Sequence, residues 1–149
     1  MPRILQRRAV CSMICLAFAA TGALGADEPG TLPLAIRGYD AVAYFTEERP
    51  TRGVPEFELV WDGHLYRFST AAQRDLFRAD PVRYAPRFEG LCAIALADGY
   101  KDEADPENWI IVNRQLYLFG GKRGPGRFAI DTAEKIARAT DTFSRVKER

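Results

Sequence analysis

The sequence predicts a small α+β domain with two β-hairpins and three helices. Two stretches, residues 57–68 and 109–119, each contain a pair of strand-like runs joined by two turn residues. Helix-like segments with recognisable ends lie between and after these hairpins. Paired strands mixed with helices, without alternation of single strands and helices, are typical of the α+β class. No linker or repeat appears after about residue 34, so we expect one domain over residues 35–149.

The first hairpin is predicted by its turn. Asp62-Gly63 is a strong two-residue turn signal between runs rich in aromatic and β-branched residues. This turn sets the expected cross-strand pairs: Trp61 with His64, Leu59 with Tyr66, and Phe57 with Phe68. These side chains share one core-like face, whereas Glu58 lies opposite Arg67 on the other face as a favourable charge pair.

A helix is expected directly after this hairpin. Thr70 and Gln73 form a capping box. Its expected apolar stripe consists of Ala72, Leu76 and Ala79, with Phe77 beside it. Asp80-Pro81 ends the helix, because proline disfavours helical geometry in the residue before it.

The second half of the domain contains the other expected elements. The alanine-rich segment between Gly90 and Gly99 predicts a short helix, and the acidic residues 101–108 predict a loop. Residues 109–112 and 115–119 form the second expected hairpin. A last helix is expected over residues 132–146. Its expected features are a capping box of Asp131 with Glu134 and a buried stripe of Ala133, Ile136, Ala137, Thr140 and Phe143.

The N-terminus predicts export from the cytoplasm. A basic start is followed by an apolar run from Ala9 to Ala20 and by small residues near Gly25. The apolar run is shorter than the roughly 20 residues that span a bilayer, so a cleaved signal peptide over residues 1–25 is favoured over a membrane anchor. Residues 26–34 are expected to be a disordered lead-in segment. We expect a periplasmic or secreted protein with no membrane span after cleavage.

Removal of this leader changes the charge and the cysteine count. The leader carries three arginines and no acid, so the 21 basic and 20 acidic residues of the chain become 18 and 20. A nucleic-acid binder would need a clustered basic surplus, so no nucleic-acid partner is expected. Of three cysteines only Cys92 is left, and a single cysteine forms no internal disulfide.

The run from residue 38 to residue 119 resembles the exported branch of the YHS-domain family. The matching pieces are Gly38-Tyr39-Asp40-Ala41-Val42-Ala43-Tyr44-Phe45, Gly63-His64-Leu65-Tyr66-Arg67-Phe68-Ser69, Phe77-Arg78-Ala79-Asp80-Pro81, Tyr84-Ala85-Pro86, Gly90-Leu91-Cys92-Ala93, Asp105-Pro106 and Leu116-Tyr117-Leu118. The resemblance implies a small α+β fold related to treble-clef metal modules.

The chain departs from the metal-associated modules of that family. Their three cysteine positions fall at Ala43, Ser69 and Gln73, and these side chains are poor ligands for zinc or copper. We therefore expect no tight structural zinc and no metal-ligating residues. The exported branch has instead a Gly-x-Cys-Ala motif, here with Cys92, and some relatives resemble selenoproteins at that position. The resemblance thus implies thiol redox chemistry or a weak metal-associated role.

Cys92 is the candidate catalytic residue, as a redox thiol. It precedes a short predicted helix, whose free N–H groups would stabilise a thiolate, although Glu89 opposes this. The alternative is a buried structural thiol, because free cysteine is among the most buried residue types. Oxidation of a reactive thiol would give a sulfenic acid, a mixed disulfide or a disulfide-linked dimer.

Other residues give weaker hypotheses. His64, Trp61 and Tyr66 are candidate binding residues if the chain is a non-catalytic binding module that uses the aromatic hairpin face. The alternative is that these three side chains belong to the core. The glycine-rich basic segment from Gly120 to Arg127 could hold an anion, but a flexible surface loop is the favoured interpretation. The partner class stays open between a small molecule, a metal ion and a protein, and no cofactor is specified.

Overall fold

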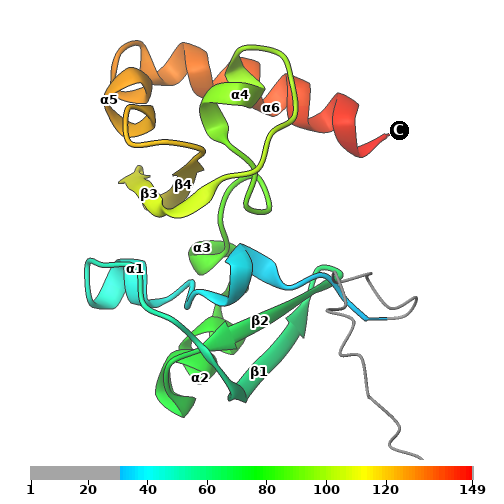
Figure 1. Ribbon diagram of the computed structural model, residues 1–149, viewed down its shortest axis with the longest axis vertical. Coiled ribbons are helices and arrows are strands. Elements are labelled where there is room, and N and C mark those ends of the chain that lie inside the picture. The colour runs from blue at the N-terminus through cyan, green and yellow to red at the C-terminus, as the bar shows by residue number, and fades with distance from the viewer. Residues whose placement is uncertain (1–30, 149) are drawn as a thin grey trace, which may run out of the picture. The chain divides into compact units, whose positions relative to one another are not determined.

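The computed structural model describes residues 31–148 and confirms the α+β class (Figure 1). Leu32–Arg149 forms one compact unit with two antiparallel hairpins and, in its described part, six α-helices, three more than expected. The elements are a 3-10 turn η1 (Ala35–Gly38), α1 (Ala43–Thr46), β1 (Val54–Trp61), β2 (His64–Phe68), α2 (Ala71–Ala79), α3 (Pro81–Tyr84), α4 (Ala93–Ala97), β3 (Asp105–Val112), β4 (Gln115–Phe119), α5 (Gly124–Ala129) and α6 (Thr132–Lys147). The expected signal peptide and residues 26–30 of the lead-in segment lie outside the described residues. At the other end of that segment, Leu34 forms a bridge with Leu65 of β2.

The turn at Asp62-Gly63 produces most of the expected register of the first hairpin. Both turn residues have positive φ values, 45° and 74°, as a tight hairpin of this type requires. The expected pairs closest to the turn are formed: Trp61 with His64, Leu59 with Tyr66, and Glu58 with Arg67. The pair Phe57 with Phe68 is wrong, because the register shifts and Phe68 pairs with Val54. Pro55 lies in this irregular stretch and has no N–H to donate to a ladder.

Helix α2 begins as expected but buries a different face. The Gln73 N–H donates to the Thr70 hydroxyl at 3.2 Å, as an N-cap requires. The expected stripe is wrong, since Leu76 is exposed and Gln73 and Phe77 are the buried residues. Phe77 packs against Tyr66 with a centroid distance of 4.6 Å. Phe77 therefore covers the inner face of the first hairpin, whereas the buried Gln73 amide donates to Thr46 of α1.

The second hairpin starts earlier than the sequence indicates. Strand β3 begins at Asp105, so the expected loop over residues 101–108 is wrong in its second half. Near the turn the register follows the prediction, with Val112 opposite Gln115. Both turn residues, Asn113 and Arg114, adopt positive φ values of 50° and 65°. Asparagine is often found in this conformation, whereas arginine is rarely found there.

Helices α4 and α6 pack against each other, and α6 differs from expectation at its start. Asp131 has a left-handed backbone with φ of 54° and makes no capping hydrogen bond, so the expected capping box is wrong. In the expected stripe Ala133 and Ala137 are not buried, and the fully buried positions are Ala139 and Thr142. Among residues 31–148 no helix is long and apolar enough to cross a membrane.

Strand β4 divides the interior into two hydrophobic clusters. Leu116 and Leu118 belong to the cluster under the first hairpin, and Tyr117 and Phe119 belong to the cluster under α4 and α6. This division follows from the alternation of side chains along a strand. Cys92 lies in the second cluster. Helices α4, α5 and α6 lie together in one half of the domain (Figure 1).

Candidate functional site

Cys92 is held at a junction of three backbone segments. Its N–H donates to the carbonyl oxygen of Asp102 at 2.9 Å, and its backbone pairs with Leu118 of β4 in a parallel bridge. On its other side it is the N-cap residue of α4, as the sequence predicts for the segment after Gly90. The cysteine backbone therefore has little freedom to move.

The thiol is oriented by the first turn of α4. The backbone N–H of Ala95 points at Sγ, with a nitrogen–sulfur distance of 3.5 Å. This contact fixes the side chain and places the positive end of an N–H dipole against the sulfur. Only 6% of the residue is exposed, so most of the thiol is packed in the second hydrophobic cluster.

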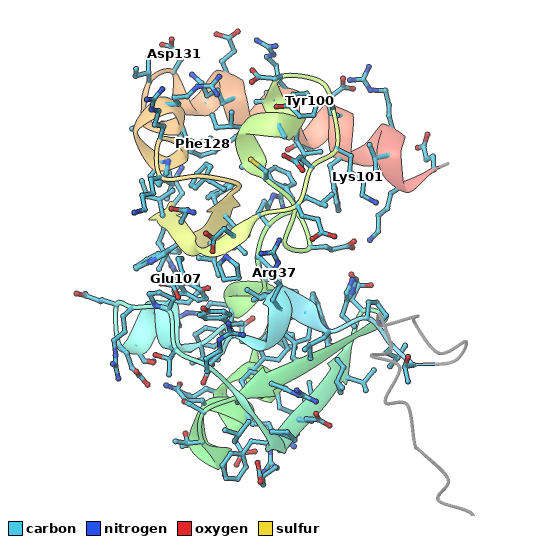
Figure 2. The ribbon with its side chains drawn as sticks, in the orientation of Figure 1. Arg37, Tyr100, Lys101, Glu107, Phe128 and Asp131 are labelled. Atoms are coloured by element: carbon cyan, nitrogen blue, oxygen red, sulfur yellow. The ribbon has the colours of Figure 1, made fainter. Side chains whose placement is uncertain are left out.

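Cys92 lines a cavity of about 430 Å³. The cavity is lined by Cys92, Ile94, Ala95, Tyr100, Asp102, Phe119, Gly120, Gly121, Lys122, Arg123, Gly124 and Arg127. Tyr100, labelled in Figure 2, is 56% exposed at this cavity. A thiol that is nearly buried yet lines a cavity can be reached by a small molecule more readily than by a second protein.

The glycine-rich basic segment forms much of this cavity: residues 120–123 are an exposed surface loop, as expected, but residues 124–127 belong to a helix, so the loop interpretation is wrong in its second half. Helix α5 begins at Gly124, where a side chain would collide with Phe119. Phe128 of the same helix packs against Phe119 with ring centroids 5.3 Å apart, and Figure 2 labels it. At Gly120 an added Cβ atom would lie 3.8 Å from Cys92 Sγ. The absence of a side chain at Gly120 keeps space open beside the thiol.

The charges of the cavity are mainly positive. Lys122, Arg123 and Arg127 line it, against the single carboxylate of Asp102. A guanidinium nitrogen of Arg127 lies 3.2 Å from a carboxylate oxygen of Asp98. Lys122 and Arg123 have no ion-pair partner among residues 31–148, and both are exposed. Two cations are therefore available to a ligand in this cavity.

His64 is placed away from Cys92. Its Nδ1 lies 2.9 Å from the carbonyl oxygen of Asp62, so it stabilises the hairpin turn. It lines a different cavity of about 180 Å³, and Cys92 does not line that cavity. Nearby, Lys147 contacts the Glu89 carboxylate, and this hydrogen bond raises the pKa of Lys147. His64 and Cys92 line different cavities, and no described hydrogen bond joins His64 to the thiol.

The aromatic hairpin face is part of the core. Tyr66 is 2% exposed, and burial raises its pKa. Trp61 is partly buried, with its ring 6.1 Å from Tyr66 and 5.9 Å from Phe77 between centroids. Because α2 covers this face, Trp61 and Tyr66 do not form the free binding surface that the sequence suggested.

Two of the three positions at which the family resemblance would place cysteine ligands, Ala43 and Ser69, contact a buried carboxylate, that of Asp40. Asp40 accepts hydrogen bonds from the N–H of Ala43 at 3.2 Å and from the Ser69 hydroxyl at 2.8 Å. Gln73 donates instead to the Thr46 hydroxyl at 2.8 Å, and its Oε1 has no hydrogen-bond partner among residues 31–148. Within the described part of the chain, no group of three or more histidine, cysteine or acidic side chains is arranged to hold a metal ion.

Comparison with protein-family models, with curated proteins and with solved structures gives no match to this chain. The candidate site is therefore argued from the positions of its residues in this structure alone. Sequence reasoning identified Cys92 and noted the basic glycine-rich segment, but it did not bring the two together. Lys122, Arg123 and Asp102 were missed as residues of the thiol cavity, because tertiary contacts place them there: the turn before α5 carries the two cations, and a hydrogen bond from the Cys92 N–H holds Asp102.

Proposed function

We propose that this chain is an exported thiol protein in which Cys92 exchanges disulfides with low-mass compounds. The observation that carries the proposal is the position of Cys92: its Sγ accepts a backbone N–H, and the residue lines a cavity of about 430 Å³. A thiol with a purely structural role needs no cavity beside it. Thiols react as thiolates, so a fixed N–H dipole at the sulfur supports this chemistry.

The exchange needs only one cysteine. The thiolate of Cys92 attacks one sulfur of a disulfide RSSR, and a new bond forms between Sγ and that sulfur. The S–S bond of the substrate breaks, and RS⁻ leaves and takes a proton from water. A second small thiol R′SH then attacks the mixed disulfide, which releases RSSR′ and restores the Cys92 thiol. No other cysteine occurs among residues 31–148, so an external thiol must complete the cycle.

The burial of Cys92 favours a small partner over a dimer linked through Cys92. A disulfide between two chains requires the two Cα atoms to approach within about 7 Å. Such an approach is obstructed at a residue that is 6% exposed and lies against helix α4. We therefore propose a mixed disulfide with a low-mass thiol as the oxidised form.

Export supports this proposal, because disulfides persist outside the cytoplasm. Intact-mass analysis of the protein recovered from an exporting bacterium tests this part. We expect a product that lacks Met1 to Gly25. A soluble product that retains these residues would contradict export.

Access to the thiol can be tested with two neighbouring glycines. Gly120→Ala places a methyl group 3.8 Å from Sγ, whereas Gly121→Ala meets nothing within 4 Å. With Cys11→Ser and Cys15→Ser in the full chain, Cys92 is the single thiol. We expect iodoacetamide to label the folded protein, Gly120→Ala to slow the labelling, and Gly121→Ala to leave it unchanged. Labelling that occurs only after denaturation would show that Cys92 is a packed core residue and would overturn the proposal.

A further inference from the structure

We propose that the cavity beside Cys92 selects an anionic substrate, so that the compound exchanged there is a low-mass disulfide carrying carboxylates or similar anionic groups. This inference rests on the proposed function for its chemistry. Its recognition element is a separate feature, the basic wall formed by Lys122, Arg123 and Arg127.

The charge on this wall is unbalanced. Among the lining residues, three cations face one carboxylate, that of Asp102. One further acid, Asp98, lies 3.2 Å from Arg127 and offsets one of the three cations. The Asp102 Oδ1 atom accepts the N–H of Glu103 at 2.9 Å, so this carboxylate is engaged with the backbone. Lys122 and Arg123 are the cations left for a ligand.

The distance between the thiol and the cations fits a short chain of atoms. Gly120 lies against Sγ, and Lys122 follows only two residues later. Two residues of extended backbone span at most about 7 Å. Because Lys122 and Arg123 line the same cavity as Cys92, we infer that an anionic group a few atoms from the reacting sulfur contacts one of these two cations. Arginine binds carboxylates with two parallel hydrogen bonds, which would also orient the substrate.

Alternative substrate charges fit this cavity less well. A cationic disulfide would be repelled by Lys122 and Arg123 and would have only Asp102 as a partner. A neutral disulfide would gain nothing from the two unpaired cations. In the exchange step the anionic groups take no part in bond making, so they contribute to binding and orientation alone.

Three aliphatic disulfides of similar size provide the test: dithiodipropionate, hydroxyethyl disulfide and cystamine, which are anionic, neutral and cationic. Rates of mixed-disulfide formation are measured by intact mass on the full chain with Cys11→Ser and Cys15→Ser. Each rate is divided by the rate of the same disulfide with the neutral thiol N-acetylcysteine amide, which removes differences in intrinsic reactivity without adding a charged group near the reference thiol. We expect the anionic disulfide to react fastest and the cationic one slowest. Added salt should reduce this difference.

The double variant Lys122→Gln, Arg123→Gln should lower the rate of the anionic disulfide by about fivefold, the size expected for two partly solvated charge contacts. It should leave the neutral disulfide unchanged. Arg138→Gln, which removes an exposed cation that does not line the cavity, is the matched control and should change none of the rates.

The two proposals fail in different ways. Equal normalised rates for the three disulfides, or an unchanged anionic rate in the double variant, would overturn the charge selection and leave the thiol exchange intact. If no disulfide reacts, the thiol exchange is overturned. The presence of the anion site is then tested separately, by the binding of suberate. Suberate is an unreactive dicarboxylate of the same chain length as dithiodipropionate. NMR titration of the Cys92→Ser protein should show suberate binding that the double variant loses, and no binding would overturn the inference.

Discussion

Replacement of Gly124 by alanine should displace helix α5, which forms part of the thiol cavity, and should lower the stability of the domain. A Cβ atom at this position would lie 2.3 Å from Cβ and 2.5 Å from Cγ of Phe119. Neither partner can yield, because Phe119 is fully buried and its ring packs against Phe128. Ordinary carbon contacts are about 3.5 to 4.0 Å, so helix α5 would have to move by about an ångström or more.

The energetic cost can be set against a matched control. Overpacking of a core costs typically about 1–3 kcal/mol and sometimes more, and we expect about 3 kcal/mol for Gly124→Ala. Gly126 lies in the same helix, and a Cβ there would meet nothing within 4 Å. Gly126→Ala should therefore stabilise the protein by up to about 1 kcal/mol through helix propensity. The two variants carry the same chemical change and should differ by about 3 to 4 kcal/mol.

Urea denaturation followed by tryptophan fluorescence measures this difference, because Trp61 and Trp109 pack against the core. Thermal unfolding followed by circular dichroism gives an independent measurement. In a domain of this size, Gly124→Ala should lower the Tm by roughly 10 °C. A free energy of unfolding within about 0.5 kcal/mol of the unmodified protein, the size of a typical surface substitution, would refute the packing of α5 on β4.

Three further variants test the buried carboxylate, the pH dependence and the cavity charge. Asp40→Asn should cost about 3 kcal/mol of unfolding free energy in urea, because an amide nitrogen cannot accept the two hydrogen bonds that Ser69 donates to Oδ2, whereas exposed Asp75→Asn should be nearly neutral. Hydrogen bonds, the largest from the Thr51 hydroxyl, hold the pKa of Glu47 below its ordinary value of 4.5. A lowered folded-state pKa gives stability that is present above the unfolded pKa and lost as the pH falls through the folded one. Thr51→Val should therefore weaken the fall in stability below about pH 4.5, and an identical pH profile would contradict this. Asp102→Asn should raise the rate with dithiodipropionate and leave that with hydroxyethyl disulfide unchanged, and a lower anionic rate would argue against charge selection.

Local signals predicted the elements of this fold that depend on neighbouring residues. Asp62-Gly63 sets the register of the first hairpin near its turn, and Thr70 begins α2. Cys92 was expected at the start of a short helix and is its N-cap. In these cases the turn geometry or the cap hydrogen bond involves residues at most three positions apart.

Features that depend on distant residues could not be predicted in the same way. The polar side chain of Gln73 can be buried because its amide donates a hydrogen bond to Thr46, and these two residues are 27 positions apart in the sequence. The capping box at Asp131 fails because the chain leaves α5 in a left-handed conformation there. Segment 120–127 resembles a loop because glycine and proline punctuate it, although the close approach to Phe119 is the reason that Gly124 must be glycine.

The candidate site shows the same division. Cys92 could be identified because it is a single chemically distinctive residue. The cavity charges could not, because Asp102, Lys122 and Arg127 come from segments that meet only in the folded domain. The aromatic residues Trp61 and Tyr66 were correctly expected on one face, and only the position of α2 decides that this face is interior.

The reactivity of Cys92 in the folded protein tests the central claim most directly. With Cys11→Ser and Cys15→Ser in place, the second-order rate constant for dithiodipropionate is measured on the folded chain and on the same chain in urea, and the adduct is located by mass. A thiol that borders an accessible basic cavity should give one adduct on Cys92, at a folded-state rate equal to or above that of the unfolded chain. A folded chain that gains no adduct, while the unfolded chain reacts fully, would contradict the account.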